Sequence, residues 1–515
     1  MTTITATPVA AHANHVGDRL RAWRTGIETR QEPVIYMRQD CPICRSEGFS
    51  TQARLQVRCG DRQIVATLDV VHGDWLAHGT AGLSEAAWVA LQPSPDAWLT
   101  VAHAAPLDSL SLLRSKVYGH RLDDAAFAAI IGDVAAGHYS DLHLATFITA
   151  CAGDRLDLSE TVGLTRAMVG VGERLRWDRP VVVDKHCVGG LPGNRTTLLV
   201  VPIVAACGLT MPKTSSRAIT SPAGTADTME VLAPVDLDIA AMRRVVDVTG
   251  GCVVWGGAVR LSPADDVLIR VERPLDLDSE GQLVASVLSK KASAGSTHVV
   301  IDLPVGPTAK VRSEAAARAL GQRLQEVGRQ LGLHVALRIS DGRQPVGRGI
   351  GPALEARDVV AVLRGAADAP DDLRQRALDL AADILEMGGA APAGQGRHLA
   401  QAVLSDGRAW GRFQAICEAQ GGMRDIPVAE HRHVVTASVA GRLTRVDNRL
   451  LARAAKLAGA PLAACAGVDV HVRLGDRVEP GQPLFTLHAQ AAGELAYALE
   501  YVTSRPPIFE LSEAS

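Results

Sequence analysis

The sequence predicts an α/β fold: a helical bundle domain and a large α/β domain with a mixed or parallel sheet, flanked by a β-rich N-terminal domain and a β-rich C-terminal subdomain. Two patterns lead to this prediction. From Pro180 onward, short apolar runs alternate with helical repeats, the order that builds a parallel sheet covered on both faces. Before Pro180, about residues 105–178 show helical periodicity alone. A chain of 515 residues can hold several such domains.

The N-terminal part shows strand patterns after a leader. In residues 1–30 small and polar residues alternate with scattered arginines, and we expect a partly disordered segment there. Residues 31–100 contain alternating apolar and polar stretches at 53–57 and 64–71, which predict the strands of a β-rich domain. A Pro-Ser-Pro sequence marks its end.

The helical domain and the α/β domain differ in their repeats. Helical spacing of apolar residues at 125–136, 142–151 and 164–175 predicts the bundle, and we expect about 263–293 to join it. The α/β domain is expected to span 180–425. Its strands are predicted at 181–183, 252–255, 298–303 and 334–339, and its helices begin near Thr196 and include 281–292 and 313–331.

Residues 433–505 return to strand patterns. Val468, Val470 and Val472 alternate with polar residues ahead of Gly475, as in a half-buried strand. The segment is therefore predicted to be a β-rich subdomain of the biotinyl type. It lacks the lysine tip that carries a covalent cofactor, so we expect none.

Composition narrows the classes of partner. Hydrophobic residues make up 47% and charged residues 21%, and the formal net charge is −3, so no field is strong enough to recruit nucleic acid. The apolar run 198–207 is too short for a membrane span and contains Pro202. We therefore expect small-molecule partners, no nucleic acid and no membrane.

The cysteines predict a reducing compartment. Nine is an odd number, and apart from Cys41 and Cys44 they lie singly, which favours the cytoplasm. With Cys59 and His72 downstream, this CxxC pair could be imagined as a zinc site. Because it lacks a second pair, reduced thiols in a turn and no metal are the preferred interpretation.

The first motif that carries chemistry runs from Val181 to Thr197, from a strand through a glycine loop to a helix start. Backbone N–H groups of such a loop and the positive end of the following helix bind anions. Lys185 and Thr197 would add an ammonium and a hydroxyl. The loop lacks both Gly-Lys-Ser/Thr and GxGxxG, which disfavours nucleoside triphosphates and dinucleotides. A tight turn that merely needs glycine is the structural alternative.

Two further motifs carry polar side chains, one suited to a sugar or a phosphate and the other to a pyrimidine base. Between Lys213 and Asp227 the chain is dense in hydroxyl side chains, which suit sugar or phosphate recognition but also occur in solvated turns. Ser286 and Lys290 stand four residues apart on one helical face, where a hydroxyl beside an ammonium can bind a pyrimidine carbonyl. Ser279 is predicted to cap this helix, leaving Asp278 just outside it, in a cleft or in a solvated turn.

Lysine usage points to the same region. The chain has seven lysines against 46 arginines, and five of the seven fall in its middle. A compact ammonium is preferred there over a planar guanidinium. These five are Lys185, Lys213, Lys290, Lys291 and Lys310.

Together the motifs resemble the thymidine phosphorylase and AMP phosphorylase family. The matching segments begin at Asp184, Pro212, Val254 and Ser289, in the family's order, and the likeness covers about residues 107–505. The β-rich N-terminal extension also resembles the one of AMP phosphorylases. The resemblance implies an enzyme that needs no metal or organic cofactor, uses inorganic phosphate as co-substrate, and forms a homodimer or higher homo-oligomer.

The resemblance also implies roles for individual residues. The phosphate site would comprise Lys185, Cys187, Gly190, Thr197, Ser215 and Thr225. The nucleoside or nucleotide would be bound by Ser216, Arg217, Ala218, Ile219, Thr220, Ser221, Ser286, Lys290 and Lys310. Either His186 or Asp278 would donate the proton, and Lys185 would hold phosphate during catalysis. Cys187 stands where the family commonly has serine, and Arg270 and Arg273 both flank the place of a substrate arginine.

The expected reaction is phosphorolysis of thymidine to thymine and 2-deoxyribose 1-phosphate. The helical and α/β domains are expected to close over the substrates. A nucleoside 5′-monophosphate phosphorylase that yields ribose 1,5-bisphosphate is the alternative, favoured by the hydroxyl-rich segment. A phosphoribosyltransferase of the anthranilate type and a catalytically silent nucleoside-binding protein are further alternatives.

Overall fold

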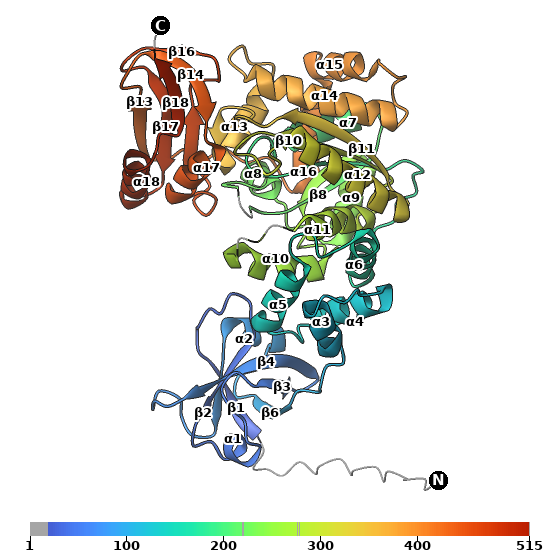
Figure 1. Cartoon of the computed structure of the whole chain (residues 1–515), viewed down its shortest axis with the longest axis vertical. Helices are drawn as coiled ribbons and strands as arrows, with labels where there is room; N and C mark the ends of the chain where they lie inside the picture. Colours follow the sequence, from blue (N-terminus) through green and yellow to red (C-terminus); the bar gives the residue numbers. More distant parts are fainter. Residues whose placement is uncertain (1–18, 219–220, 276, 278, 514–515) are drawn as a thin grey trace. The chain divides into compact units, whose positions relative to one another are not determined.

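The computed structural model describes residues 19–218, 221–275, 277 and 279–513 (Figure 1). The chain forms two compact units. The first contains the described residues up to His120, together with Gly132–Ala150 and Arg270–Leu275. The second contains Arg121–Ile131, Cys151–Ile269 and the described residues from 277 onward.

The first unit is built on a closed β-barrel with the strand order β1-β5-β2-β4-β3-β6. Alternating apolar residues fill its interior, among them Leu55 and Leu68, and Cys41 and Cys44 belong to the same apolar core. Strand β1 lies within residues 1–30, so the leader predicted there is wrong for this part: barrel structure begins before residue 31. The elements are β1 (Arg19–Arg24), β2 (Val34–Arg38), α1 (Pro42–Ser46), β3 (Arg54–Cys59), β4 (Arg62–Val71), β5 (Thr80–Leu83), α2 (Glu85–Leu91) and β6 (Trp98–His103).

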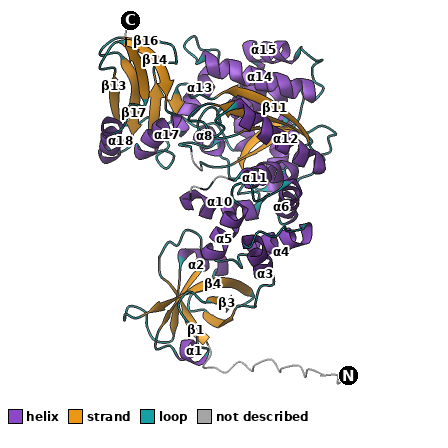
Figure 2. Ribbon diagram, viewed as in Figure 1, coloured by secondary structure: helices purple, strands orange, loops and turns teal. Residues whose placement is uncertain are grey.

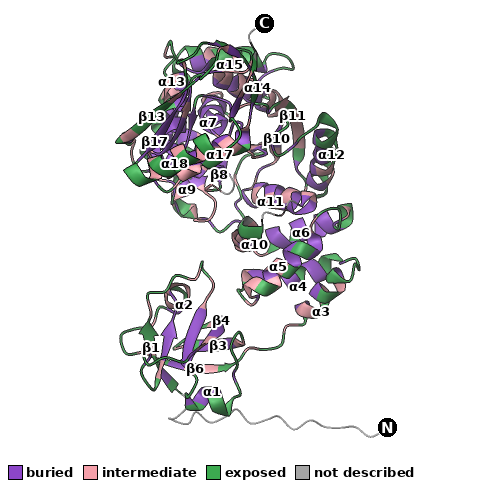
Figure 3. Cartoon of the chain, turned by 60° about the vertical axis from the view of Figure 1, so that its left-hand side comes forward, coloured by how far each residue is buried: buried purple, intermediate pink, exposed green. Residues whose placement is uncertain are grey.

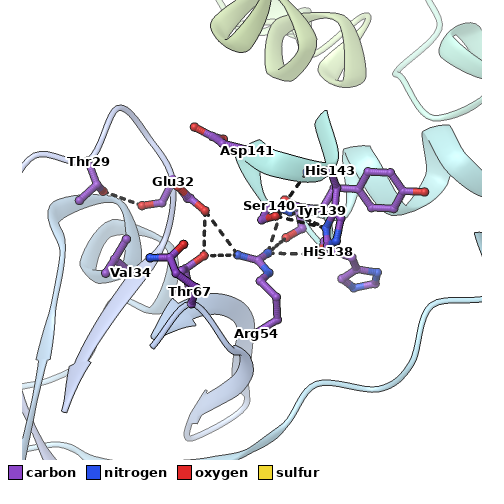
Figure 4. Close-up of polar contacts among 12 residues, drawn as sticks. Thr29, Glu32, Val34, Arg54, Thr67, His138, Tyr139, Ser140, Asp141 and His143 are labelled. Atoms are coloured by element: carbon purple, nitrogen blue, oxygen red, sulfur yellow. Dashed lines mark hydrogen bonds and ion pairs between the residues drawn. The ribbon is translucent and has the colours of Figure 1, made fainter. Parts of the chain in front are cut away.

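An arginine joins the barrel to the helical part of the first unit. At the start of β3, Arg54 donates to the carbonyl oxygens of Gly137 at 3.0 Å and His138 at 3.2 Å, in the turn after α4 (Figure 4). The same guanidinium donates to Thr67 Oγ1 at 2.8 Å and lies 3.7 Å from the Glu32 carboxylate. A cation at the carboxyl end of a helix is favourable. The first unit holds α3 (Ser109–Val117), α4 (Asp124–Ala135) from Gly132 onward and α5 (Asp141–Cys151) up to Ala150.

The second unit contains the predicted parallel sheet. Strands β11, β10 and β7 pair in parallel, as do β8 and β9. A parallel bridge between Val182 and Thr210 connects the two sets, giving the order β11-β10-β7-β8-β9. The strands are β7 (Val183–Cys187), β8 (Met211–Ser215), β9 (Gly251–Trp255), β10 (His298–Val305) and β11 (His334–Asp341).

Helices cover both faces of this sheet (Figure 2). Successive residues of a strand point to opposite faces. In β10, Val300 packs in one apolar core with α7 and α14, and Ile301 packs in another with α11 and α12. Helix α7 is buried over almost its whole length, whereas α12 exposes its outer side (Figure 3). The second unit's helices here are α7 (Thr196–Ala206), α8 (Thr225–Leu232), α9 (Ile239–Thr249), α11 (Glu280–Ser293), α12 (Glu314–Gln330), α13 (Pro352–Leu363), α14 (Asp371–Met387), α15 (Gly396–Ser405) and α16 (Arg408–Gln420).

Two helices outside the sheet complete the helical part. Helix α6 (Leu158–Gly170) packs against α11 and begins earlier than the predicted 164–175. Helix α10 (Pro263–Leu275) contributes its first residues, up to Ile269, to the second unit. The predicted helices at 125–136 and 142–151 are confirmed as α4 and α5. Among the described residues, no helix combines the length and the apolar character that crossing a membrane requires.

The C-terminal subdomain contains two antiparallel sheets, the smaller with the order β16-β14-β18, and two helices that the sequence pattern did not predict. An antiparallel sheet has the order β12-β15-β17-β13, and its β12 comes from residues 349–350, before the subdomain itself. The elements are β12 (Gly349–Ile350), β13 (His431–Thr436), β14 (Gly441–Val446), α17 (Asn448–Leu457), β15 (Gly467–Val470), β16 (Arg477–Val478), β17 (Pro483–Ala489), α18 (Ala492–Ser504) and β18 (Phe509–Glu513). Because β12 pairs with β15, the subdomain is hydrogen-bonded to the α/β part.

Candidate active site

The loop between β7 and α7 makes a tight turn that only glycine fits. Gly190 has φ +104°, and a Cβ there would lie 2.8 Å from the backbone nitrogen of Lys310. A side chain at this position would therefore collide with the loop that follows β10. The turn then enters α7, whose first N–H groups carry the positive end of the helix dipole.

Lys185 places its ammonium at the start of α7. The side chain is fully buried, and its Nζ donates to Thr196 Oγ1 at 2.6 Å and to Thr197 Oγ1 at 3.2 Å. Burial lowers the pKa of Lys185. The structure thus brings Lys185 and Thr197 together at the first turn of α7.

Cys187 faces a carboxylate that belongs to none of the sequence motifs. Its Sγ lies 3.4 Å from Asp302 Oδ2, on the neighbouring strand β10. Burial, reinforced by the charge of Asp302, raises the pKa of the Cys187 thiol to about 12. Asp302 also accepts from Ser340 Oγ at 2.5 Å and pairs with Arg376 at 3.4 Å. The thiol is therefore protonated and held by a buried polar network.

Asp184 forms ion pairs with two lysines that lie far from it in the sequence. The carboxylate is fully buried and lies 2.7 Å from Lys291 Nζ and 3.5 Å from Lys213 Nζ. These ammonium groups outweigh burial and hold the pKa of Asp184 below its usual value. Burial, together with four nearby lysines, lowers the pKa of His186 well below its usual range. His186 is therefore neutral at physiological pH.

The hydroxyl-rich segment after β8 meets the glycine loop. Thr225 Oγ1, at the start of α8, donates to the carbonyl oxygen of Asn194 at 3.3 Å. Asp227 Oδ2 accepts from the backbone N–H groups of Ala218 at 2.6 Å and Gly224 at 2.8 Å, which closes the segment on itself. Ser215 Oγ is buried and has no hydrogen-bond partner among the described residues. Thr225 thus contacts the glycine loop directly, and the phosphate contacts of Ser215 and Thr225 stay a prediction.

The guanidinium of Arg217 is bound by neighbouring side chains. It forms two hydrogen bonds with the Glu230 carboxylate, one of them 3.0 Å long, and its guanidinium stacks 4.9 Å from the Trp255 ring. Glu230 hydrogen bonding raises the pKa of Arg217. In this conformation Arg217 stabilises the segment around it. Ser216 is exposed and Ser221 is buried.

Ser286 and Lys290 lie on one face of α11, as the spacing predicted. Lys290 Nζ donates to Ser286 Oγ at 3.2 Å and lies 2.5 Å from Asp265 Oδ2 at the start of α10. Ser279 caps α11 by accepting from the Gln282 backbone N–H at 3.4 Å, which confirms the predicted cap.

The remaining predicted residues are placed as follows. Lys310 is exposed, and its backbone adjoins Gly190. Ile219, Thr220 and Asp278 lie outside the described residues, as does the side chain of Arg273. Asp265 and Asp302 were missed because an isolated aspartate in a helix or strand carries no spacing signal. Their partners are distant in the sequence.

Three family models match the chain in succession. Residues 110–172 match the helical bundle domain of a glycosyl transferase family, and residues 179–410 match its a/b domain. Residues 442–508 match the pyrimidine nucleoside phosphorylase C-terminal domain. These matches define the class of protein: a glycosyl transferase with a nucleoside phosphorylase C-terminal domain.

Curated relatives resemble the chain over nearly its whole length. "Putative thymidine phosphorylase 1" of Acidovorax sp. (strain JS42) is 77% identical over 96% of this chain and 97% of its own length. "Putative thymidine phosphorylase" of Legionella pneumophila (strain Corby) is 56% identical over 96% of both chains. The chain belongs to the thymidine phosphorylase family, which confirms the resemblance inferred from the motifs.

A solved structure shares the fold at low identity. Anthranilate phosphoribosyltransferase (TrpD) from Thermus thermophilus aligns with a TM-score of 0.51 and 18% identity, and covers 60% of this chain and 99% of that one. This similarity supports the architecture of a helical domain with an α/β domain.

Proposed function

We propose that the chain is a pentosyltransferase that cleaves a pyrimidine nucleoside with inorganic phosphate, converting thymidine to thymine and 2-deoxyribose 1-phosphate. Membership in the thymidine phosphorylase family supports this reaction. So does the absence of Walker A and GxGxxG motifs from the anion-binding loop.

One structural observation supports the proposal most. Asp184 adjoins Lys185 in β7 and pairs at 2.7 Å with Lys291, the neighbour of Lys290 in α11. Strand β7 thus directs Lys185 toward α7, where phosphate would bind, and is joined through Asp184 to α11, the helix that would bind the base. Phosphorolysis requires both ligands to meet at one sugar carbon, and a strand shared by the two sites fixes their separation.

In the proposed reaction, a phosphate oxygen attacks C1′ of the sugar as the bond from C1′ to the base nitrogen breaks. The electron pair of that bond goes to the base, which takes up a proton. Lys185, Thr197 and the N–H groups of the glycine loop would hold phosphate, and Lys290 with Ser286 would stabilise the developing negative charge of the base. Neutral His186 would donate a hydrogen bond to the base, and Asp278, the other candidate, would supply the proton from a protonated carboxyl group.

The nucleotide alternative rests on the family resemblance, which assigns Lys310 to the nucleotide; the backbone of Lys310 adjoins the glycine turn. A phosphorylase of this kind would act on AMP and release ribose 1,5-bisphosphate. A silent binding protein would bind a nucleoside without releasing base.

A substrate panel tests the proposal. Purified enzyme is incubated with thymidine, uridine or AMP, with and without phosphate, and the free base is measured by chromatography. We expect phosphate-dependent release of thymine, with no requirement for magnesium or pyrophosphate. Release from AMP alone would favour the nucleotide alternative, and binding without release would contradict the proposed activity.

A further inference from the structure

A leucine of the glycine turn lies in the core of the C-terminal subdomain. Leu191 follows Gly190 directly, yet it is only 5% exposed and belongs to the apolar cluster formed by that subdomain. Members of the cluster include Ile350, Leu443, Leu451 and Phe485. The β7–α7 loop is therefore anchored by a side chain that leaves its own domain.

The backbone at this position is unfavourable for leucine. Leu191 has φ +86°, a region that non-glycine residues rarely adopt. Such strain persists only where surrounding contacts determine the conformation, and it concentrates at functional sites. Burial of the Leu191 side chain supplies contacts that offset it.

A hydrogen bond to the next residue, Pro192, also holds the loop. Val346 donates its backbone N–H to the carbonyl oxygen of Pro192 at 2.5 Å. Arg473 of the C-terminal subdomain donates to the carbonyl oxygens of Pro345 at 2.8 Å and Gly347 at 2.7 Å. The segment that contacts the glycine turn is thus itself fixed by the subdomain.

The loop that passes Gly190 is fixed in a similar way. Thr308 Oγ1 accepts from the Asn448 backbone N–H at 3.1 Å, and Asn448 Nδ2 donates to the carbonyl oxygen of Gly342 at 2.9 Å. Asn448 begins α17. Both segments that contact the turn therefore depend on residues of the C-terminal subdomain.

We propose that Leu191 is a positioning residue that fastens the phosphate-binding turn to the C-terminal subdomain, so that this subdomain is a structural part of the phosphate site. The proposal rests on the proposed function for its ligand. The anchoring itself is independent of turnover.

Three variants of the anchor test the proposal. Leu191→Ala and Leu191→Gly both remove the buried side chain, whereas Leu191→Met keeps its apolar volume. We expect the first two to raise the KM for phosphate about tenfold, because a small displacement of binding groups is costly, and to change the KM for thymidine less than about twofold. Leu191→Met is expected to behave like the wild type.

The Leu191→Gly variant separates the effect of losing the buried side chain from the effect of relieving the backbone strain. It accepts φ +86° freely, so Leu191→Gly would equal or improve on the wild type if only the backbone mattered. Leu487→Ala is the matched control, since Leu487 is fully buried in the same cluster but lies in β17. It is expected to lower the melting temperature and leave the phosphate KM unchanged. An equal rise of the phosphate KM in this control would overturn the proposal.

Hydrogen exchange of the full-length protein gives a readout that needs no activity. We expect amides of residues 188–194 to lose protection about tenfold in Leu191→Ala and to keep it in Leu487→Ala. Should Leu191→Ala fail to fold, Thr308→Val removes one supporting hydroxyl at equal volume and is expected to loosen the same amides. If hydrogen exchange of residues 188–194 is unchanged in these variants, Leu191 does not position the turn, even if the enzyme cleaves thymidine. Absence of thymidine cleavage by the wild type refutes the proposed function alone.

Discussion

The Asp265 carboxylate lies 2.5 Å from the ammonium of Lys290, and only 3% of the aspartate side chain is exposed. Ser286 Oγ accepts a hydrogen bond from the same ammonium at 3.2 Å. The ammonium is therefore held between a buried carboxylate and a hydroxyl. The Lys290 side chain keeps 25% exposure, which leaves it accessible to a base carbonyl.

Asp265→Asn is expected to let the Lys290 side chain reorient. Because Lys290 is proposed to bind the base, kcat/KM for thymidine should fall about tenfold to a hundredfold while the KM for phosphate stays constant. Initial rates, measured with thymidine and phosphate varied in turn, give the two kinetic constants separately. Asp383→Asn, which breaks the similarly short pair with Arg338, is the control. Equal losses in both variants would mean that Asp265 has only a structural role.

Lys185→Ala removes the buried ammonium at the first turn of α7. The KM for phosphate should rise about a hundredfold, the usual cost of losing one donor to an anion in a buried site. Phosphate saturation curves at fixed thymidine measure this. Lys456→Ala, far along the chain in α17, is expected to leave the curve unchanged. Unaltered phosphate kinetics in Lys185→Ala would refute the role of this lysine.

Cys187 is expected to resist alkylation in the native enzyme, because burial raises the pKa of its thiol to about 12. Mass spectrometry after iodoacetamide treatment at neutral pH should find it unmodified until the protein is unfolded.

The Cys187→Ser variant replaces the thiol by a hydroxyl, which forms stronger hydrogen bonds and should lower the KM for phosphate severalfold. A higher KM would indicate that the contact with Asp302 needs the larger sulfur atom.

Arg195 is expected to be essential for stability. Its buried guanidinium lies 3.0 Å from Asp358 and 3.3 Å from Glu355, and it also donates to the carbonyl oxygen of Gly349. Arg195→Met would leave the buried Asp358 carboxylate without a cation and Glu355 without its ion-pair partner, and we expect the unfolding free energy to fall by about 3–5 kcal/mol. Urea denaturation measures the loss. A change below about 1 kcal/mol would show that the carboxylates are easily neutralised.

The raised pKa of Glu355 predicts how the stability of the protein depends on pH. Burial outweighs the attraction of Arg195 and raises the pKa of Glu355 to about 7. Since the folded protein binds this proton more tightly than the unfolded chain, the stabilising contribution is complete below the unfolded pKa and is lost as pH rises through about 7. Urea denaturation at several pH values should show that the wild type loses stability over this interval relative to Glu355→Gln. Parallel curves would contradict the shifted pKa.

The parallel sheet and the glycine turn could be predicted from the sequence, but strand β7 was placed too early. Apolar residues predicted a strand at 181–183, whereas it spans Val183–Cys187 and includes Asp184, Lys185 and His186. Three successive polar residues favour a loop when only their neighbours in the sequence are considered. They form a buried strand because Lys213 and Lys291, far away in the sequence, neutralise Asp184.

The spacing of Ser286 and Lys290 predicted their contact because a helix fixes which residues share a face. No such rule connects Lys290 with Asp265, or Cys187 with Asp302, because these contacts depend on how separate elements pack. Leu191 was passed over for a further reason. A leucine between glycine and proline has the composition of an ordinary turn, and only the structure shows that its side chain lies in another core.

The buried carboxylate of Asp184, shared between two ammonium groups, has an evolutionary consequence. Replacing it alone would leave two cations in a dry interior, and replacing either lysine alone would change the charge balance around the other. We expect the three positions to be inherited as a set across homologues. A lineage that lost one of them should have lost the others within few steps.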